Sequence, residues 1–115
     1  MIPRGVEIFV GVEAIDLRWS FDRLSDIATE RIGRAARSGA LFVFFGKRRD
    51  AIKILFFDGT GLCLFYKRLD RSTFRLPEVE GDAASLAIDE RALDDLLDGI
   101  DVETKALPRR PARVH

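Results

Sequence analysis

Apolar residues along this chain fall into short blocks separated by turn-forming residues. Five blocks have the length and the β-branched and aromatic content of strands: residues 6–10, 41–45, 51–57, 62–67 and 73–76. The block LFVFF at 41–45 is wholly apolar, which predicts a central strand. The last four blocks are joined by short links rich in turn residues, including the hairpin signal Asp58-Gly59. Short links favour an antiparallel meander, so we predict a mainly antiparallel sheet of four or five strands.

A helical pattern separates the first strand from the others. Its apolar positions follow one another at steps of three, three, one and four, which places them on one stripe: Phe21, Leu24, Ile27, Ala28 and Ile32. Ser20 stands where an N-cap is expected, and Ser38-Gly39 provides a stop signal. We therefore predict one long helix over residues 21–37 that packs on the sheet.

The C-terminal part predicts a second, shorter helix. Residues 77–85 have the composition of a loop, and Asp89 then caps a helix over residues 90–98 that Gly99 ends. Its outer face is acidic, with Asp94, Asp95 and Asp98. Residues 104–115 are basic and have no periodic pattern, so we expect a disordered tail. The predicted organisation is a single α+β domain over residues 1–103 followed by this tail.

Composition agrees with one globular domain. The chain has 115 residues, of which 47% are hydrophobic and 33% are charged. No apolar run reaches the roughly 20 residues of a membrane helix, and the N-terminus has no signal-peptide layout. Cys63 is the only cysteine, so an internal disulfide is impossible. We expect a cytoplasmic protein without a membrane partner.

Charge is unevenly distributed although the net charge is zero. Residues 1–77 carry 14 Lys and Arg and 9 Asp and Glu, a net charge of +5. Residues 78–103 have a net charge of −9 and residues 104–115 one of +4. A basic body, an acidic segment and a basic tail can attract one another or steer a partner.

The candidate chemistry of the sequence does not favour an enzyme. The only histidine, His115, is the last residue, so a His-based triad or a Cys/His zinc site is not expected. Without such a base, Cys63 is better interpreted as a small buried hydrophobic residue than as a nucleophile. Asp16, Asp22 and Asp58 are a candidate for a small nuclease that uses two metal ions, but helix and turn roles explain Asp22 and Asp58 better. No cofactor and no metal are predicted.

Basic residues gather where the predicted meander turns. Lys47, Arg48, Arg49 and Lys53 cluster at one hairpin end, and Lys67, Arg68 and Arg71 end the next strand but one. In a meander the links after the second and fourth strands lie on the same edge of the sheet, so we expect both groups to lie together. This edge is either a solvated, solubilising rim or a surface that binds phosphate groups.

Several stretches together resemble a known family. They are MIPRGVEIFV, AIDLRWSFDRL, SGALFVFFGKRRDAIKILFFDGTGLCLFYKRLDRSTFRLP and LLDGIDVE, and they span residues 1 to about 103. The pattern is similar to that of the small TnpB accessory proteins of the insertion sequence 66 family of bacterial transposable elements, which are not the RNA-guided nuclease of the same name. The sequence departs from the family pattern at Trp19, where members often have a basic residue.

The resemblance implies a non-enzymatic protein that supports DNA transposition beside a separate, co-encoded transposase. Two hypotheses follow. In the first, the protein binds DNA phosphates through the basic residues named above. In the second, it docks on the transposase without contacting DNA, through the acidic face of Asp94, Asp95 and Asp98.

Overall fold

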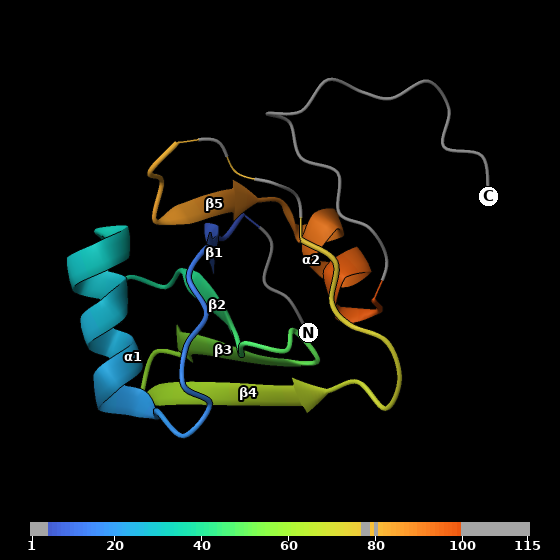
Figure 1. The fold of residues 1–115 in the computed structure, drawn as a ribbon. Helices are drawn as coiled ribbons and strands as arrows, with labels where there is room; N and C mark the ends of the chain where they lie inside the picture. The colour runs from blue at the N-terminus through green and yellow to red at the C-terminus, as the bar shows by residue number, and fades with distance from the viewer. Residues whose placement is uncertain (1–4, 77–78, 80, 100–115) are drawn as a thin grey trace.

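A computed structural model of the chain describes residues 5–76, 79 and 81–99. These residues form five strands and three helical segments (Figure 1), in the order β1 (Ile8–Gly11), α1 (Phe21–Ile27), η1 (Ala28–Ile32), β2 (Leu41–Phe45), β3 (Ala51–Phe57), β4 (Leu62–Arg68), β5 (Ser85–Ile88) and α2 (Glu90–Leu97). The predicted tail at 104–115 and the end of the predicted domain lie outside the described residues.

The strands form one mixed sheet in the order β4-β3-β2-β1-β5. β2, β3 and β4 are the predicted antiparallel meander, and β5 is antiparallel to β1. β1 pairs with β2 in parallel, with Ile8 opposite Leu41, so the expectation of a meander that includes the first strand was wrong. The cause is the helical crossover between these two strands, which returns the chain to the same end of the sheet. The predicted α+β class with a mainly antiparallel sheet is confirmed.

The fifth strand is not the one that the sequence predicted. Residues 73–76 form no strand, because Phe74 leaves the line of β4 and is buried, with its ring 5.7 Å from that of Phe45. The amide of Phe74 donates a hydrogen bond to the carbonyl oxygen of Arg49 at 2.6 Å, which holds the chain across the end of the sheet. The fifth strand is instead Ser85–Ile88, which begins at the last residue of the predicted loop and pairs with β1.

The first helix ends earlier than predicted. α1 begins at Phe21 after Ser20, as expected, although the Ser20 side chain makes no capping hydrogen bond. The π-helical segment η1 continues it to Ile32, and Gly33 ends it in the left-handed conformation (φ 87°). This conformation favours glycine and is a common helix stop. The helix was predicted to continue to residue 37 and ends at Ile32, five residues earlier.

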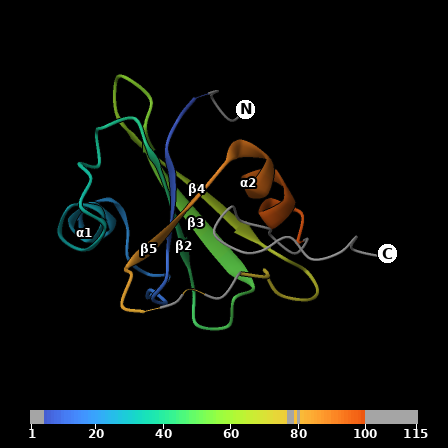
Figure 2. The same ribbon diagram turned by 90° about the horizontal axis from the view of Figure 1, so that it is seen from above.

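Helices cover both faces of the sheet. Figure 2 shows α1 on one side of the sheet and α2 on the other. Phe42 and Phe44 of β2 belong to the core beneath α1, whereas Leu41, Val43 and Phe45 belong to the core beneath α2. This arrangement explains why β2 is apolar at every position, and it confirms the predicted central strand.

α2 begins as predicted at the Asp89 cap, whose side chain accepts a hydrogen bond from the amide of Ala92 at 2.8 Å. Leu93 and Leu96 are fully buried on its inner face, where each contributes about 1.5–3 kcal/mol through burial.

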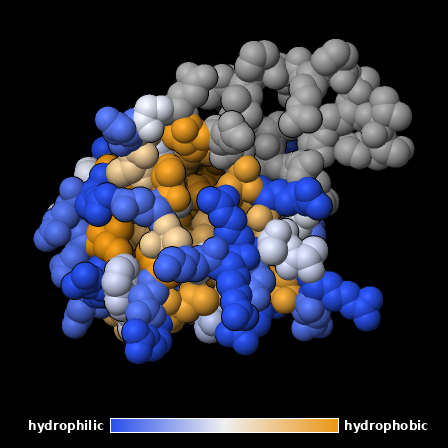
Figure 3. Space-filling model, in the orientation of Figure 1, coloured by the Kyte–Doolittle hydropathy of each residue, from blue (hydrophilic) through white to orange (hydrophobic). Residues whose placement is uncertain are grey.

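On the face seen in Figure 3, hydrophilic side chains surround smaller hydrophobic areas. Among the described residues, no helix is long and apolar enough to cross a membrane.

Candidate nucleic-acid interface

The two predicted basic groups lie at the same end of the sheet. The antiparallel register of β3 and β4 places Ala51 opposite Arg68, so the β2–β3 turn lies beside the end of β4. The amide of Leu69 donates a hydrogen bond to the carbonyl oxygen of Asp50 at 2.8 Å, which fastens the two segments together. The two segments that carry these groups therefore lie side by side, and the direction of each side chain decides which of the basic residues share a site.

A groove of about 610 Å³ opens at this end of the sheet. Its basic lining residues are Lys47, Arg48 and Arg68, and the exposed side chains of all three leave their charges in contact with water. Asp16 and Asp50 also line it. Arg49 and Arg71 are exposed as well but do not line this groove; Arg49 lines another hollow with Val10, Leu76 and Leu86.

Lys53 has a structural position instead of a surface one. Its side chain is only 8% exposed, and its ammonium group donates hydrogen bonds to the carbonyl oxygens of Leu17 at 2.6 Å and Trp19 at 2.8 Å. The ring of Tyr66 lies 5.2 Å from the same nitrogen, within the range of a cation–π contact. These contacts occupy Lys53 and tie β3 to the loop before α1.

Lys67 faces α2, on the side of the sheet away from the groove. Neighbouring residues of a strand point to opposite faces, so Lys67 and Arg68 diverge. The Lys67 ammonium group donates a hydrogen bond to the carbonyl oxygen of Leu97 at 2.7 Å, in the last turn of α2. A cation at this end of a helix compensates the partial negative charge of its free carbonyl groups. Lys67 thus acts as a cap for α2.

The loop between β1 and α1 forms the other wall of the groove. The amide of Ile15 donates a hydrogen bond to the carbonyl oxygen of Phe45 at 2.8 Å, and Leu17 packs directly over Gly46. Asp16 pairs with Arg18 at 2.7 Å. The hydrogen bonds from the Arg18 side chain and amide lower the pKa of the Asp16 carboxyl to about 2. The carboxylate therefore stays ionised, and the guanidinium group of Arg18 compensates its charge within the loop.

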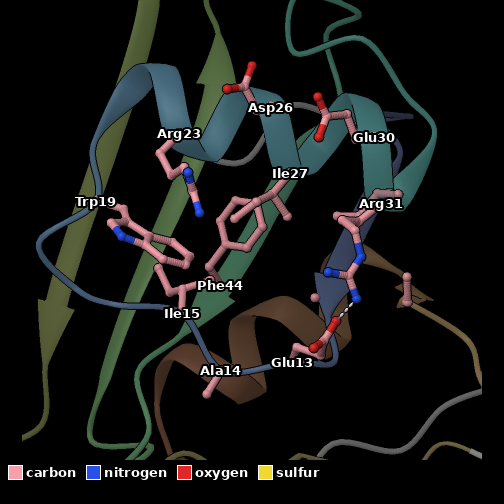
Figure 4. A pocket seen from close by; sticks show the side chains of 13 residues that line it. Glu13, Ala14, Ile15, Trp19, Arg23, Asp26, Ile27, Glu30, Arg31 and Phe44 are labelled. Carbon is pink, nitrogen blue, oxygen red and sulfur yellow. Dashed lines mark ion pairs between the residues drawn. The ribbon is translucent and has the colours of Figure 1, made fainter.

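A second hollow of about 290 Å³ lies between this loop and α1 (Figure 4). Arg23 reaches from α1 towards Trp19, with its guanidinium carbon 4.7 Å from the ring centre, and Ile15, Ile27 and Phe44 supply apolar lining. Arg31 forms an ion pair with Glu13 across the hollow. Sequence reasoning missed this site; its only signal was the single tryptophan of the chain, four residues before an arginine.

The carboxylates considered for a nuclease are separate. Asp16 is paired with Arg18, Asp22 lies exposed in the first turn of α1, and Asp58 accepts hydrogen bonds from the Thr60 and Gly61 amides at 2.9 and 3.0 Å. Within the described ranges, no three His, Cys, Asp or Glu residues lie close enough together to hold a metal ion. Cys63 is half-buried, and desolvation raises the pKa of its thiol, which disfavours the reactive thiolate.

Comparison with known proteins assigns the family. Residues 6–106 match the family described as IS66 Orf2 like protein. The chain belongs to this IS66 Orf2-like family. It is 37% identical over 116 residues to the uncharacterized protein y4hO of Sinorhizobium fredii, with 99% of each chain covered. It is 30% identical over 113 residues to the uncharacterized protein y4jC of the same organism, covering 96% of this chain and 95% of the relative. No solved structure matches the chain.

The predicted family resemblance is thereby confirmed, and it makes this IS66 Orf2-like chain an accessory protein of an insertion sequence. The predicted partner face of this protein lies on α2. Asp94 and Asp98 are exposed and Asp95 is half-buried, and the last turn of α2 contains no basic residue. Acidic side chains are unfavourable at the C-terminal end of a helix, so the stability of α2 does not explain them.

Proposed function

We propose that this IS66 Orf2-like protein supports transposition by binding DNA phosphates in the groove at the end of the sheet, without catalysing a reaction. The observation that carries the proposal is the convergence of Lys47, Arg48 and Arg68 from two separate segments on one groove. Two guanidinium groups and an ammonium group suit phosphate oxygens, to which arginine can donate paired hydrogen bonds.

The rigidity of the groove supports the same proposal. The turn that carries Lys47 and Arg48 connects the buried strands β2 and β3 directly. The loop that forms the opposite wall is tied to the sheet by Lys53 and by the Ile15–Phe45 hydrogen bond. A merely solubilising turn needs no such fixed geometry. Phosphate contacts fix the position of a protein on DNA without reading the sequence, so we expect binding with little sequence preference.

The test is DNA binding by the purified protein at low salt, followed by fluorescence anisotropy of a labelled duplex. The variant Lys47→Ala/Arg48→Ala/Arg68→Ala should lose most of the affinity. A control variant should remove the same charge from exposed positions outside the groove: Arg34→Ala/Arg37→Ala/Arg91→Ala. Equal losses in the two variants would mean that net charge, and not the groove, determines binding.

A second candidate function is docking on the co-encoded transposase through Asp94, Asp95 and Asp98. The unfavourable position of these carboxylates on α2 supports it, because surface charge without a stabilising role is available for a basic partner. Changing all three to Asn should not lower the melting temperature, because the charges are unfavourable at this end of the helix, and should weaken co-purification with the transposase. If this variant still co-purifies with the transposase as the parent does, docking through these three residues is excluded.

A further inference from the structure

We infer that the groove and the hollow beside it together bind an unpaired DNA strand, with a base stacked on Trp19 and Arg23 and the neighbouring phosphates in the groove. This inference rests on the proposed function and adds to it the structural state of the DNA. It also assigns a role to Trp19 and Arg23, which belong to neither of the two predicted groups of basic residues.

Trp19 stands at the border between the two sites. It lines both the groove and the hollow, together with Ala14 and Ile15. A strand whose phosphates lie in the groove therefore passes directly beside the indole ring. The hydrogen bond from Lys53 to the Trp19 carbonyl oxygen holds this part of the loop in place, so the ring is presented from a fixed backbone.

The two sites differ in charge in the way that a nucleotide requires. The groove has three basic and two acidic lining residues, whereas the hollow has three acidic and two basic ones, of which Arg31 is paired with Glu13. Phosphate is therefore favoured in the groove, and the carboxylates of Asp26 and Glu30 disfavour it in the hollow. Carboxylates can instead accept hydrogen bonds from the amino groups of bases. The half-buried side chain of Ile27 offers apolar surface to the flat face of a base, above the buried ring of Phe44. We therefore place the base in the hollow and the phosphates in the groove.

The stacked Trp19–Arg23 pair distinguishes unpaired from paired DNA. Aromatic rings and guanidinium planes are the surfaces on which single-stranded binding proteins stack bases. In a duplex the faces of the bases are covered by their neighbours, and a base must leave the stack before a side chain can cover it. A site of this kind consequently prefers unpaired overhangs, gaps or opened segments to a fully paired duplex.

The parent protein itself provides the first test, because Trp19 is its only tryptophan. Titration with a short single-stranded DNA of mixed sequence should quench its fluorescence in a saturable manner, and the matching blunt duplex should quench it much less at equal salt. Absence of quenching by the single strand, or equal quenching by both, would overturn the inference.

Variants give the second test. Trp19→Ala should weaken single-strand binding by about 5- to 150-fold, the range for losing one base–aromatic stack, and Trp19→Phe should restore most of it. Phe21→Ala is the matched control, since Phe21 is a 42% exposed aromatic residue two positions after Trp19, at the start of α1, and lines neither site. Arg23→Gln leaves the indole in place and should also lower single-strand affinity. This variant provides the test if Trp19→Ala does not fold. An unchanged single-strand affinity in both Trp19→Ala and Arg23→Gln would contradict the inference.

The two proposals fail in different ways. If Trp19→Ala lowers single-strand and duplex affinity equally, the base-stacking inference is wrong while phosphate binding stands. If the parent protein binds neither DNA, or if Lys47→Ala/Arg48→Ala/Arg68→Ala binds the duplex as the parent does, the proposed function itself is wrong.

Discussion

The ammonium group of Lys53, on the buried strand β3, lies 2.8 Å from the carbonyl oxygen of Trp19, which it holds by a hydrogen bond. The same nitrogen binds the Leu17 carbonyl oxygen at 2.6 Å. One buried side chain therefore connects the centre of the sheet to the loop that separates the basic groove from the hollow beneath α1.

Replacing Lys53 by Met should destabilise the protein by about 1–3 kcal/mol, because two carbonyl groups lose their buried donor while the apolar stem is kept. The released loop should also expose Trp19 and shift its fluorescence to longer wavelength. Urea denaturation and an emission spectrum measure both effects. Lys47→Met, in the exposed turn, is the control and should change stability by less than about 0.5 kcal/mol. Equal stability of the two variants would refute the structural role of Lys53.

Gly46 should not tolerate a side chain. A Cβ atom at this position would lie 2.6 Å from a terminal methyl group of Leu17, so Gly46→Ala must displace Leu17 and the groove wall. We expect a loss of about 1–3 kcal/mol in the free energy of unfolding, the usual cost of overpacking. Gly61→Ala should be nearly neutral, because a Cβ atom there meets nothing within 4 Å. Equal melting temperatures of Gly46→Ala and Gly61→Ala would show that Leu17 does not restrict the side chain at position 46.

Phe74 should be essential although it belongs to no strand. Its ring is 2% exposed and packs edge-on against Phe45, so Phe74→Ala should cost about 3–5 kcal/mol. Chemical denaturation measures this loss. Phe21→Ala, which truncates an exposed ring, should cost far less. A small effect of Phe74→Ala would mean that residues 73–76 do not anchor the basic end of the sheet.

Acid should weaken the β3–β4 hairpin through Asp58. Hydrogen bonds from the Thr60 and Gly61 amides lower the pKa of its carboxyl from 3.8 to about 2. A carboxyl whose pKa is lowered by folding stabilises the folded state above its ordinary pKa, and this contribution is lost as the pH falls towards 2. The parent protein should therefore lose more stability between pH 4 and about 2 than Asp58→Asn does. Parallel stability profiles would contradict this assignment, and an NMR titration of the carboxyl measures its pKa directly.

The sequence predicted those parts of the fold that depend on local pattern. The apolar block of β2, the Asp58-Gly59 turn and the Asp89 cap each carry their own signal, and all three occur as predicted. β5 has four residues with no clear alternation, and it forms because β1 offers a free edge, which only the tertiary structure reveals. The early helix stop at Gly33 was missed because a helical pattern can continue past a single glycine.

The candidate site was predictable in outline but not in detail. Turn positions and strand register were enough to bring the two basic groups together. The direction of each side chain was not predictable, and it divides residues that look alike: Arg68 lines the groove, Lys67 caps α2, and Lys53 is buried. Lys53 lies between Ile52 and Ile54 in a wholly buried part of β3. This apolar sequence context was the only sign that its ammonium group lies inside the protein and not on its surface.

The salt dependence of duplex DNA affinity tests the central claim most directly. Each phosphate contact contributes about 0.9 to the slope of log affinity against log salt concentration. Replacing Lys47, Arg48 and Arg68 by Ala should therefore lower the slope by up to roughly three, while the control that removes Arg34, Arg37 and Arg91 keeps a slope close to that of the parent. A parent slope near zero, or the same slope in the parent and the groove variant, would contradict phosphate binding in this groove.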